Sequence, residues 1–555
     1  MATLLALLCG GAWPVVAQAP PPQRAPAGAV RVTTRLVLVD VVVIDKEGRT
    51  VGDLKKEDFA LTENGKQQSI ATFTFEQAEL ARAAAKPAPL PPNFYTNRPE
   101  YRTPPGPLTM LLLDALNTPL GDQAYARQQM LKYLETQLQP NQGTAILALG
   151  NSLRLLQDFT SDPQLLRAAV QKYTASKSTL LTEESDKLDP SFTGSSGAAA
   201  RLQEFEQEQI AAQTDVRVQI TLAALRSIAR TAAGFPGRKV LIWVSGAFPI
   251  SLDPQEFITG RLSGLSQSRF YAQEVERTAA LLADAQVAIY PVDARGLVGP
   301  ALADASRHGS IPANAGIDRQ GSELLTSHQT MMQLAEDTGG RAFINRNDID
   351  QAVASGAAEG ATYYELGYYP EAKIWDGKFH KLAVKVQRAG VVVRHRRGYF
   401  ATDPAHWRDA NQKPDLDISN ALREPIPATQ VVFIARVVPQ AAGPQTHIDI
   451  QFAAYADTLS FEEEPEGRHH ASVDFLAVAV SPDGKIAAND SKTMEAHLRP
   501  ETYARVQKEG VPFHMDLQVA PGNYQLHLGV RDNRTGWIGT LTVPLPLNPS
   551  PPAKP

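Results

Sequence analysis

Ser245 is the residue whose surroundings come nearest to a covalent catalytic site. It follows the apolar run 239–244 and precedes Gly246, the order found at the nucleophile elbow of serine hydrolases. Trp243 stands where the first glycine of the G-x-S-x-G pattern belongs, so that pattern is absent. The sequence also contains no P-loop, no G-x-G-x-x-G after a strand and no H-E-x-x-H. These observations favour a non-catalytic protein, and an envelope hydrolase with an unrecognised active site is the alternative.

Histidine and arginine clusters are interpreted as structural. His469 and His470 follow a run of glutamates, but neighbours on a strand point to opposite faces, so we expect a solvated loop and no metal site. His328 shares a helical face with apolar residues, which predicts a position at the core boundary. The basic run 394–397 is local, and nucleic-acid binding needs more positive charge than this chain provides.

Composition describes a modular globular protein. The 555 residues are 43% apolar and 20% charged, which predicts about three to four domains with apolar cores. A net charge of −5 gives no global attraction to nucleic acid or an anionic membrane. Cys9 is the single cysteine, so neither an intramolecular disulfide nor a cysteine zinc site is expected.

The N-terminal run 4–19 is apolar and closes with small residues, which predicts a signal peptide and export to the periplasm or the extracellular space. It is shorter than the ~20 residues of a membrane span, so no transmembrane segment is expected in the mature chain. A basic residue before the run is missing, which leaves a buried or disordered apolar tail as the alternative.

Alternating strand and helix patterns fill the middle of the chain, with buried strands expected at Leu108–Leu113, Thr144–Leu149 and Lys239–Ser245. This alternation predicts an α/β fold with a doubly wound, mostly parallel sheet, flanked by β-rich units and followed by a β-sandwich. The predicted order is a signal peptide (1–19), a proline-rich tail (20–29), an N-terminal β unit (30–77), a linker (78–104), the α/β domain (105–350), a β hairpin extension (351–401), a linker (402–428), a β-sandwich (429–546) and a disordered tail (547–555).

The two outer β segments of the first 400 residues are expected to pack together. A unit of two or three strands cannot bury its apolar face alone, so 30–77 should dock on the strands within 362–400. Within the latter, 378–387 and 391–400 are expected to form a hairpin through Ala389-Gly390.

Ordered segments in the first two thirds of the chain resemble the von Willebrand factor A-related family found in Acidobacteria and their relatives. Together they lie between residues 30 and 401. The matching stretches are VVVIDKEGRTVGDLKKEDFALTENGKQQSIATF (41–73), LLLDALNT (111–118), GRKVLIWVSGAFP (237–249), LAEDTGGRAFINRNDI (334–349), YYELGYYP (363–370), GKFHKLAVKV (377–386) and VRHRRGYF (393–400).

The resemblance implies a metal-ion-dependent adhesion site at the C-terminal ends of parallel strands, where oxygen ligands hold Mg²⁺ and an open position takes a partner's carboxylate. The positions implied here are Asp114, Thr118 and Ser245. Leu116 replaces one expected hydroxyl, and Ser245-Gly246 replaces an expected Asp, so the site is degenerate.

A single carboxylate predicts at most weak Mg²⁺ binding. In the alternative, Asp114 caps the following turn while Asn117-Thr118 helps to start the next helix. The overall expectation is an exported binding or scaffold protein that contacts a protein or cell-envelope ligand through this domain, with no nucleic-acid partner. Further ligand candidates are Thr179, Thr160, Asp253 and Asp293.

Overall fold

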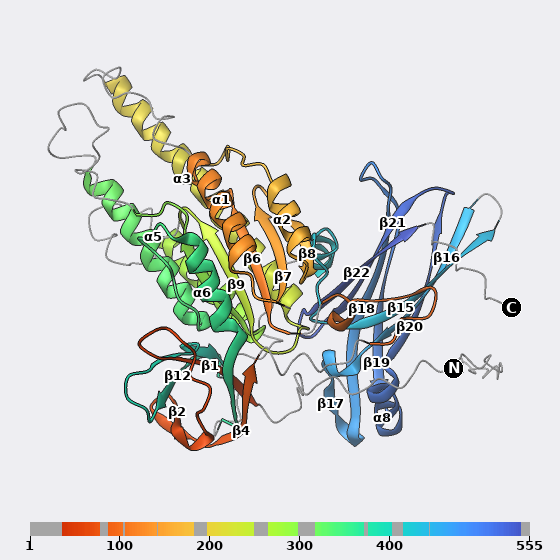
Figure 1. Cartoon of the computed structure of the whole chain (residues 1–555). Helices are drawn as coiled ribbons and strands as arrows, with labels where there is room; N and C mark the ends of the chain where they lie inside the picture. The colour runs from red at the N-terminus through yellow and green to blue at the C-terminus, as the bar shows by residue number, and fades with distance from the viewer. Residues whose placement is uncertain are drawn as a thin grey trace.

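The computed structural model describes residues 36–77, 87–103, 106–140, 142–181, 197–248, 265–297, 317–370, 376–401, 414–442 and 445–545. The expected signal peptide and both expected terminal tails lie outside these residues. Figure 1 shows an N-terminal β unit, a central sheet between helices, and a two-sheet domain formed by the last part of the chain.

The fold class expected from the sequence, a doubly wound and mostly parallel sheet, is wrong for this chain. The described residues form five sheets, of which four are antiparallel throughout and the fifth is mixed. The reason lies in the connections, because parallel neighbours need a crossover of about a dozen residues. Many successive strands are joined by much shorter turns, as where Asn64-Gly65 links β2 (Phe59–Glu63) to β3 (Lys66–Gln68).

The central sheet is the mixed one, with strand order β10-β9-β6-β7-β8. Helices cover both of its faces, so the inner strands are continuous apolar runs. The edge strand β8 (Leu153–Thr160) runs antiparallel to its neighbour β7, because the three residues 150–152 between them are too few for a crossover. As an edge strand it is only half-buried. The parallel strands, buried at all seven of their residues, are β6 (Leu108–Asp114), β7 (Gly143–Leu149), β9 (Lys239–Ser245) and β10 (Val287–Asp293).

Two sets of helices enclose this sheet. Successive residues of a strand point to opposite faces, so Leu113 packs under the first set and Leu112 under the second. The first set is α1 (Leu120–Thr136), α2 (Pro163–Lys172) and α6 (Ile349–Ala361). The second set is α3 (Gly197–Ala232), α4 (Leu265–Asp284) and α5 (Ile317–Thr338).

The N-terminal unit combines strands from both sides of the central domain. Its sheets have the orders β13-β1-β11-β4 and β14-β12-β2-β3. Val37 lies opposite Tyr368 in one sheet and Glu63 opposite Leu382 in the other. Each segment therefore buries the apolar face of the other. The remaining strands are β1 (Val37–Ile44), β4 (Ile70–Gln77), β11 (Thr362–Tyr368), β12 (Phe379–Val386), β13 (Val392–Arg394) and β14 (Gly398–Phe400).

The hairpin expected between 378–387 and 391–400 forms only at its open end, where residues 379–381 pair with 398–400. β13 pairs with β1 and β14 pairs with β12, so the second segment divides between two sheets. The ring of His395 explains the division, because its Nε2 accepts the Val384 N–H at 3.1 Å. The side chain of His395, between β13 and β14, thus accepts the N–H of β12 that a backbone carbonyl of a paired strand would otherwise accept.

The C-terminal domain packs one antiparallel sheet, β20-β16-β15-β5, on another, β17-β18-β21-β22, whose β18 also pairs with β19. Phe452 and Phe475 meet between the sheets with ring centroids 5.2 Å apart. α7 (Pro414–Ala421) and α8 (Pro500–Glu509) flank the domain. The strands are β5 (Phe94–Thr96), β15 (Phe433–Ala442), β16 (Gln445–Ala454), β17 (Glu462–Glu464), β18 (Arg468–Val480), β19 (Ile486–Leu498), β20 (Val511–Val519), β21 (Tyr524–Asp532) and β22 (Ile538–Leu545).

β5 lies in the proline-dense segment expected to be a linker, yet it completes the C-terminal domain. Thr96 pairs with Ile434, and the side chain of the next residue, Asn97, is fully buried. Asn97 Nδ2 donates to the carbonyls of Ala428 and Val431 at 3.0 and 2.8 Å. A segment that precedes the central domain is therefore built into the domain that follows it.

His469 and His470 lie on β18, and the expected solvated loop is wrong. Residues 462–464 form β17, which pairs with this end of β18. The two rings do point to opposite faces, since His469 stacks on Tyr503 and His470 stacks on His497. The alternation of a strand was the correct part of the argument.

Candidate functional site

The structure brings the three residues implied by the resemblance to one edge of the central sheet. Asp114 ends β6 and Ser245 ends β9, and these strands are parallel neighbours, so their carboxyl ends meet. Thr118 lies in the loop after β6, where its Oγ1 accepts the Gly246 N–H at 2.8 Å. All three side chains are buried.

The carboxylate of Asp114 is enclosed by protein donors. Its Oδ2 accepts from Asn117 Nδ2 at 2.9 Å, from Trp243 Nε1 at 3.0 Å and from Ser245 Oγ at 2.8 Å. Its Oδ1 accepts the backbone N–H of Asn117 at 3.0 Å. Asp114 is only 3% exposed, and burial raises its pKa while these hydrogen bonds lower it.

Asn117 extends this cluster to α3. Its Nδ2 also donates to Thr221 Oγ1 at 3.0 Å, and its Oδ1 is buried with no partner among the described residues. Arg217, one helical turn before Thr221, is buried as well; burial lowers its pKa and the charge of Asp114 raises it. We call Asp114, Asn117, Thr118, Thr221 and Ser245 the strand-end cluster.

The strand-end cluster does not offer Mg²⁺ a free set of oxygen ligands. Both oxygens of Asp114 already accept protein hydrogen bonds, and the hydroxyl of Ser245 donates to Asp114. Among the described residues one buried amide oxygen, on Asn117, remains without a partner. Hard cations need several oxygen ligands with negative charge. The metal role of Asp114, Thr118 and Ser245 therefore stays a prediction.

The alternative role for Asp114 is visible in part. Its Oδ1 holds the Asn117 N–H three residues on, which closes the turn after β6. The helix itself begins at Leu120 after Pro119, with no side-chain cap. Thr118 thus accepts the N–H of Gly246 instead of capping the helix. The two loops lie close together there, since a Cβ added to Gly246 would be 3.1 Å from Pro119 Cδ.

The other ligand candidates are scattered. Thr160 pairs with Thr144 at the start of β7, which is the opposite edge of the sheet. Thr179 is exposed in the segment after α2. Asp293 ends β10 beside Ser245. Asp253 lies outside the described residues.

Sequence reasoning missed the partner of Asp293. His328 of α5 places its Nε2 2.7 Å from Asp293 Oδ2, and Arg295 holds the same carboxylate through Nε and Nη2, each at 2.9 Å. Burial raises the pKa of Asp293, but the bonds from His328 and Arg295 outweigh it, so the pKa is lowered overall. The signal available in the sequence was the position of Asp293 at the end of a buried apolar strand, where a carboxylate needs a partner such as His328 or Arg295.

Two helices, α3 and α5, project beyond the central sheet, as Figure 1 shows. α3 reaches the cluster at Thr221, so its preceding residues 197–220 extend roughly 35 Å beyond, at 1.5 Å per residue. Phe205 and Val216, three helical turns apart on the same side of α3, are 61% and 45% exposed. This edge of the sheet therefore carries exposed apolar side chains on a projecting element.

Buried charges also gather at the other edge of the sheet, where β9 starts. Lys239 is 1% exposed and its Nζ donates to the Phe235 carbonyl at 2.8 Å. Burial lowers the pKa of Lys239 to about 7, although the nearby carboxylates of Asp40 and Glu365 raise it. The ammonium is therefore poorly compensated.

No protein-family model matches this chain. No curated protein matches it either. Among the described residues, no helix has both the length and the apolar character that a membrane crossing needs.

Several solved structures align with the chain at low scores. An aerotolerance-related membrane protein from Bacteroides fragilis NCTC 9343 aligns over 45% of this chain and 98% of its own, with 11% identity and a TM-score of 0.24. The conserved hypothetical protein BatB from Bacteroides thetaiotaomicron aligns over 46% and 99%, with 11% identity and a TM-score of 0.24. The PilB minor pilin from Streptococcus sanguinis aligns over 46% and 60%, with 8% identity and a TM-score of 0.24. Such scores carry no argument about function.

Proposed function

We propose that this chain is an exported, non-catalytic binding protein whose von Willebrand A-like domain engages a protein or cell-envelope ligand without a metal ion. The proposal is carried by one observation: the carboxylate that would hold the metal is buried and saturated by Asn117, Trp243 and Ser245. A cation would have to displace several of these donors. The ligand then contacts the rim of the strand ends instead of a bound ion.

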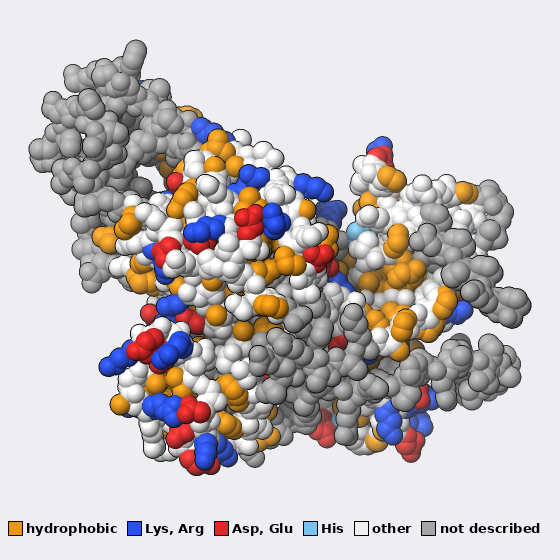
Figure 2. Space-filling view, viewed as in Figure 1, with side chains coloured by type: hydrophobic (Ala, Val, Ile, Leu, Met, Phe, Trp, Pro, Cys, Tyr) orange, Lys and Arg blue, Asp and Glu red, His pale blue; other side chains and the backbone are white. Residues whose placement is uncertain are grey.

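The projecting part of α3 supports a protein ligand. Its exposed Phe205 and Val216 are apolar side chains that a protein partner would remove from water on binding. Figure 2 shows basic and acidic side chains interspersed over the N-terminal unit and the helices of the central domain. Mixed signs give little long-range attraction to a polyanion, so nucleic acid is not included among the partners.

The hydrolase alternative gains no support from Ser245. This serine is fully buried, and its single hydroxyl proton is shared between two acceptors, Asp114 Oδ2 at 2.8 Å and the Ala247 carbonyl at 2.9 Å. A serine nucleophile needs room for its substrate beside the hydroxyl, and a fully buried side chain does not offer that room. Labelling of Ser245 by a serine-hydrolase probe would overturn the non-catalytic proposal.

Capture from the native envelope fraction tests the binding surface. We expect the tagged full chain to retain a partner, with the same yield in the presence and absence of EDTA. A Phe205→Ser, Val216→Ser double variant should lose most of that yield. Ile486→Ser, which changes a residue 54% exposed on β19, is the matched control and should not. Loss of capture with EDTA, or no loss in the double variant, would contradict the proposal.

Export has its own test. Cleavage after the apolar run should give a mature N-terminus between Gln18 and Arg24. N-terminal sequencing of the protein from the envelope fraction checks this, and an intact Met1 there would count against cleavage.

A further inference from the structure

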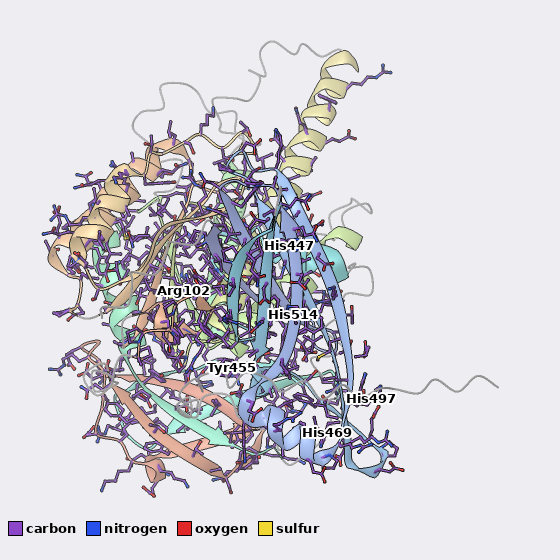
Figure 3. The ribbon with its side chains drawn as sticks, turned by 90° about the vertical axis from the view of Figure 1, so that its right-hand side faces the viewer. Arg102, His447, Tyr455, His469, His497 and His514 are labelled. Carbon is purple, nitrogen blue, oxygen red and sulfur yellow. The ribbon has the colours of Figure 1, made fainter. Side chains whose placement is uncertain are left out.

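Two strands of the C-terminal domain carry the same short polar pattern. β16 contains His447-Ile448-Asp449-Ile450-Gln451, and β20 contains His514-Met515-Asp516-Leu517-Gln518. In both, the apolar residues are buried in the core, so His, Asp and Gln share the outer face. Figure 3 shows His447 and His514 on this sheet, apart from His469 and His497 near α8.

The antiparallel register makes the two patterns face each other. Asp449 lies directly opposite Asp516, His447 opposite Gln518, and His514 opposite Gln451. The array has a local twofold arrangement centred on the two aspartates. Two carboxylates are thus held side by side on a rigid sheet, although like charges directly opposite each other are unfavourable.

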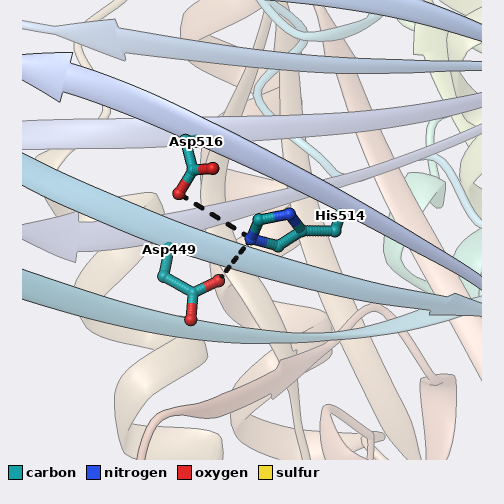
Figure 4. Close-up of side chains that lie close together, drawn as sticks. All are labelled: Asp449, His514 and Asp516. Atoms are coloured by element: carbon teal, nitrogen blue, oxygen red, sulfur yellow. Dashed lines mark hydrogen bonds and ion pairs between the residues drawn. The ribbon is translucent and has the colours of Figure 1, made fainter. Parts of the chain in front are cut away.

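His514 bridges the two carboxylates, as Figure 4 shows. Its Nε2 lies 2.9 Å from Asp449 Oδ1 and 3.7 Å from Asp516 Oδ1. One possible ligand atom from each of the three residues lies within 4.8 Å of the other two. Ligands about 2.0–2.2 Å from a tetrahedral Zn²⁺ are roughly 3.3–3.6 Å apart, which falls between the two observed distances.

The environment of this group differs from that of the strand-end cluster. The side chains of His514 and Asp516 are 56% and 59% exposed, and that of Asp449 is 20% exposed. His514 and Asp516 therefore face solvent, whereas Asp449 is partly covered and its Oδ2 accepts from the exposed Gln451 Nε2 at 3.1 Å, a partner that an ion can replace. Two carboxylates and one neutral imidazole carry a net charge of −2, which balances a divalent cation.

We propose that Asp449, His514 and Asp516 form a binding site for a divalent transition-metal ion of the zinc class. Mixed nitrogen and oxygen ligands suit such ions, whereas Mg²⁺ prefers oxygen alone. Three protein ligands leave a fourth position for water or for a carboxylate or imidazole of another molecule. The site lies in the C-terminal domain and is independent of the function proposed for the central domain.

Titration of the metal-free full chain with Zn²⁺ and Co²⁺ tests the site. We expect Co²⁺ to give the visible absorption bands of a four-coordinate ion, and Zn²⁺ to remove them. His514→Gln and Asp516→Asn should each weaken binding at this site by at least about tenfold, because each removes a direct ligand. His527→Gln, which changes a half-buried histidine that contacts Thr542 on the other sheet, is the matched control and should bind as the parent does.

The outcomes separate the proposal from a plain surface ion pair. Binding by the parent and control that is lost in both ligand variants supports the site. Absence of Co²⁺ bands in the parent, or bands unchanged in both ligand variants, overturns it. His447→Gln tests the local twofold arrangement: if this variant abolishes binding and His514→Gln does not, the assignment to His514 is overturned. Circular dichroism spectra that match the parent show that the variants are folded.

Discussion

The carboxylate of Asp114 and the carboxylates of Asp449 and Asp516 occupy opposite environments. Asp114 is buried and accepts hydrogen bonds from Asn117, Trp243 and Ser245. Asp449 and Asp516 are on an outer face, where the imidazole of His514 lies between them and Asp449 Oδ2 also accepts from Gln451 Nε2 at 3.1 Å. The first carboxylate stabilises the fold by satisfying buried donors, and the second pair keeps lone pairs available to an ion.

This difference shows that a ligand pattern and ligand availability are separate properties. The resemblance implied a metal role for Asp114, but the neighbouring donors decide whether its oxygens are free. Buried polar groups must be satisfied within the protein, whereas exposed ones exchange partners with water at little cost. The predictions below test this contrast in order of decreasing effect.

Removal of the Asp114 carboxylate should cause the largest loss of stability. Asp114→Ala leaves the indole of Trp243 and the side chain of Asn117 without their acceptor, beside the buried Arg217. We expect the free energy of unfolding to fall by about 3 to 5 kcal/mol. Urea unfolding of the two proteins measures it, and a loss below about 1 kcal/mol would show that the cluster is not structurally important.

Lys239 should make stability depend on pH. Its pKa is about 7 in the folded chain and near its ordinary value of 10.5 in the unfolded chain. Between these values the unfolded chain binds the extra proton, so the free energy of unfolding rises with pH. Relative to Lys239→Met, the parent should gain about 2 kcal/mol between pH 7 and pH 9. Lys485→Met, at an exposed lysine, is the control; an equal gain in both comparisons would exclude Lys239 as the cause.

Loss of one hydroxyl should have a smaller effect at the buried site and almost none at an exposed one. Ser245→Ala removes a single donor to Asp114, and we expect a loss of about 1 kcal/mol. Ser472→Ala removes a donor to Glu495 and an acceptor for Asn533 Nδ2 at a half-exposed position of the C-terminal domain, and it should cost less than about 0.5 kcal/mol because water can replace both bonds. Equal losses in thermal or urea unfolding would remove the contrast between the two regions.

The smallest effect is expected at the proposed metal site. Without metal, Asp516→Ala should change the free energy of unfolding by less than about 0.5 kcal/mol, because exposed ion pairs contribute little. With Zn²⁺ present, the parent should gain thermal stability and the variant should not. A large loss in the metal-free variant would mean that Asp516 has a structural role.

Local sequence patterns predicted the elements but not their neighbours. The buried strand Lys239–Ser245 was predicted with the bounds observed, and the predicted strand Leu108–Leu113 is one residue shorter than β6. Both are continuous apolar runs, which periodicity identifies directly. The pairing of β13 and β14 in different sheets depends on the ring of His395, a contact that no local pattern contains.

For the candidate site, too, the local pattern predicted the position of a residue but not its partners. The position of Asp114 at a strand end followed from the apolar run 108–113, whereas its bonds to Trp243 and Ser245 join residues about 130 apart in sequence. Asp449 and His514 were missed because they lie on different strands. The repeated His-x-Asp-x-Gln pattern was the signal that could have paired them.

The interleaving of β1 to β5 with late strands has a consequence during synthesis on the ribosome. The hydrogen bond from Thr96 to the Phe433 carbonyl joins residues 337 apart in sequence, and that from Leu54 to the Tyr364 hydroxyl joins residues 310 apart. Neither bond can form until the later residue has been synthesised. At about 5 to 20 residues per second, such delays last roughly 15 to 70 s. Nascent β1 to β4 would expose unpaired strand edges throughout that time, which invites intermolecular association. Vectorial synthesis therefore leaves the earliest strands of this chain without their pairing partners until the later strands emerge.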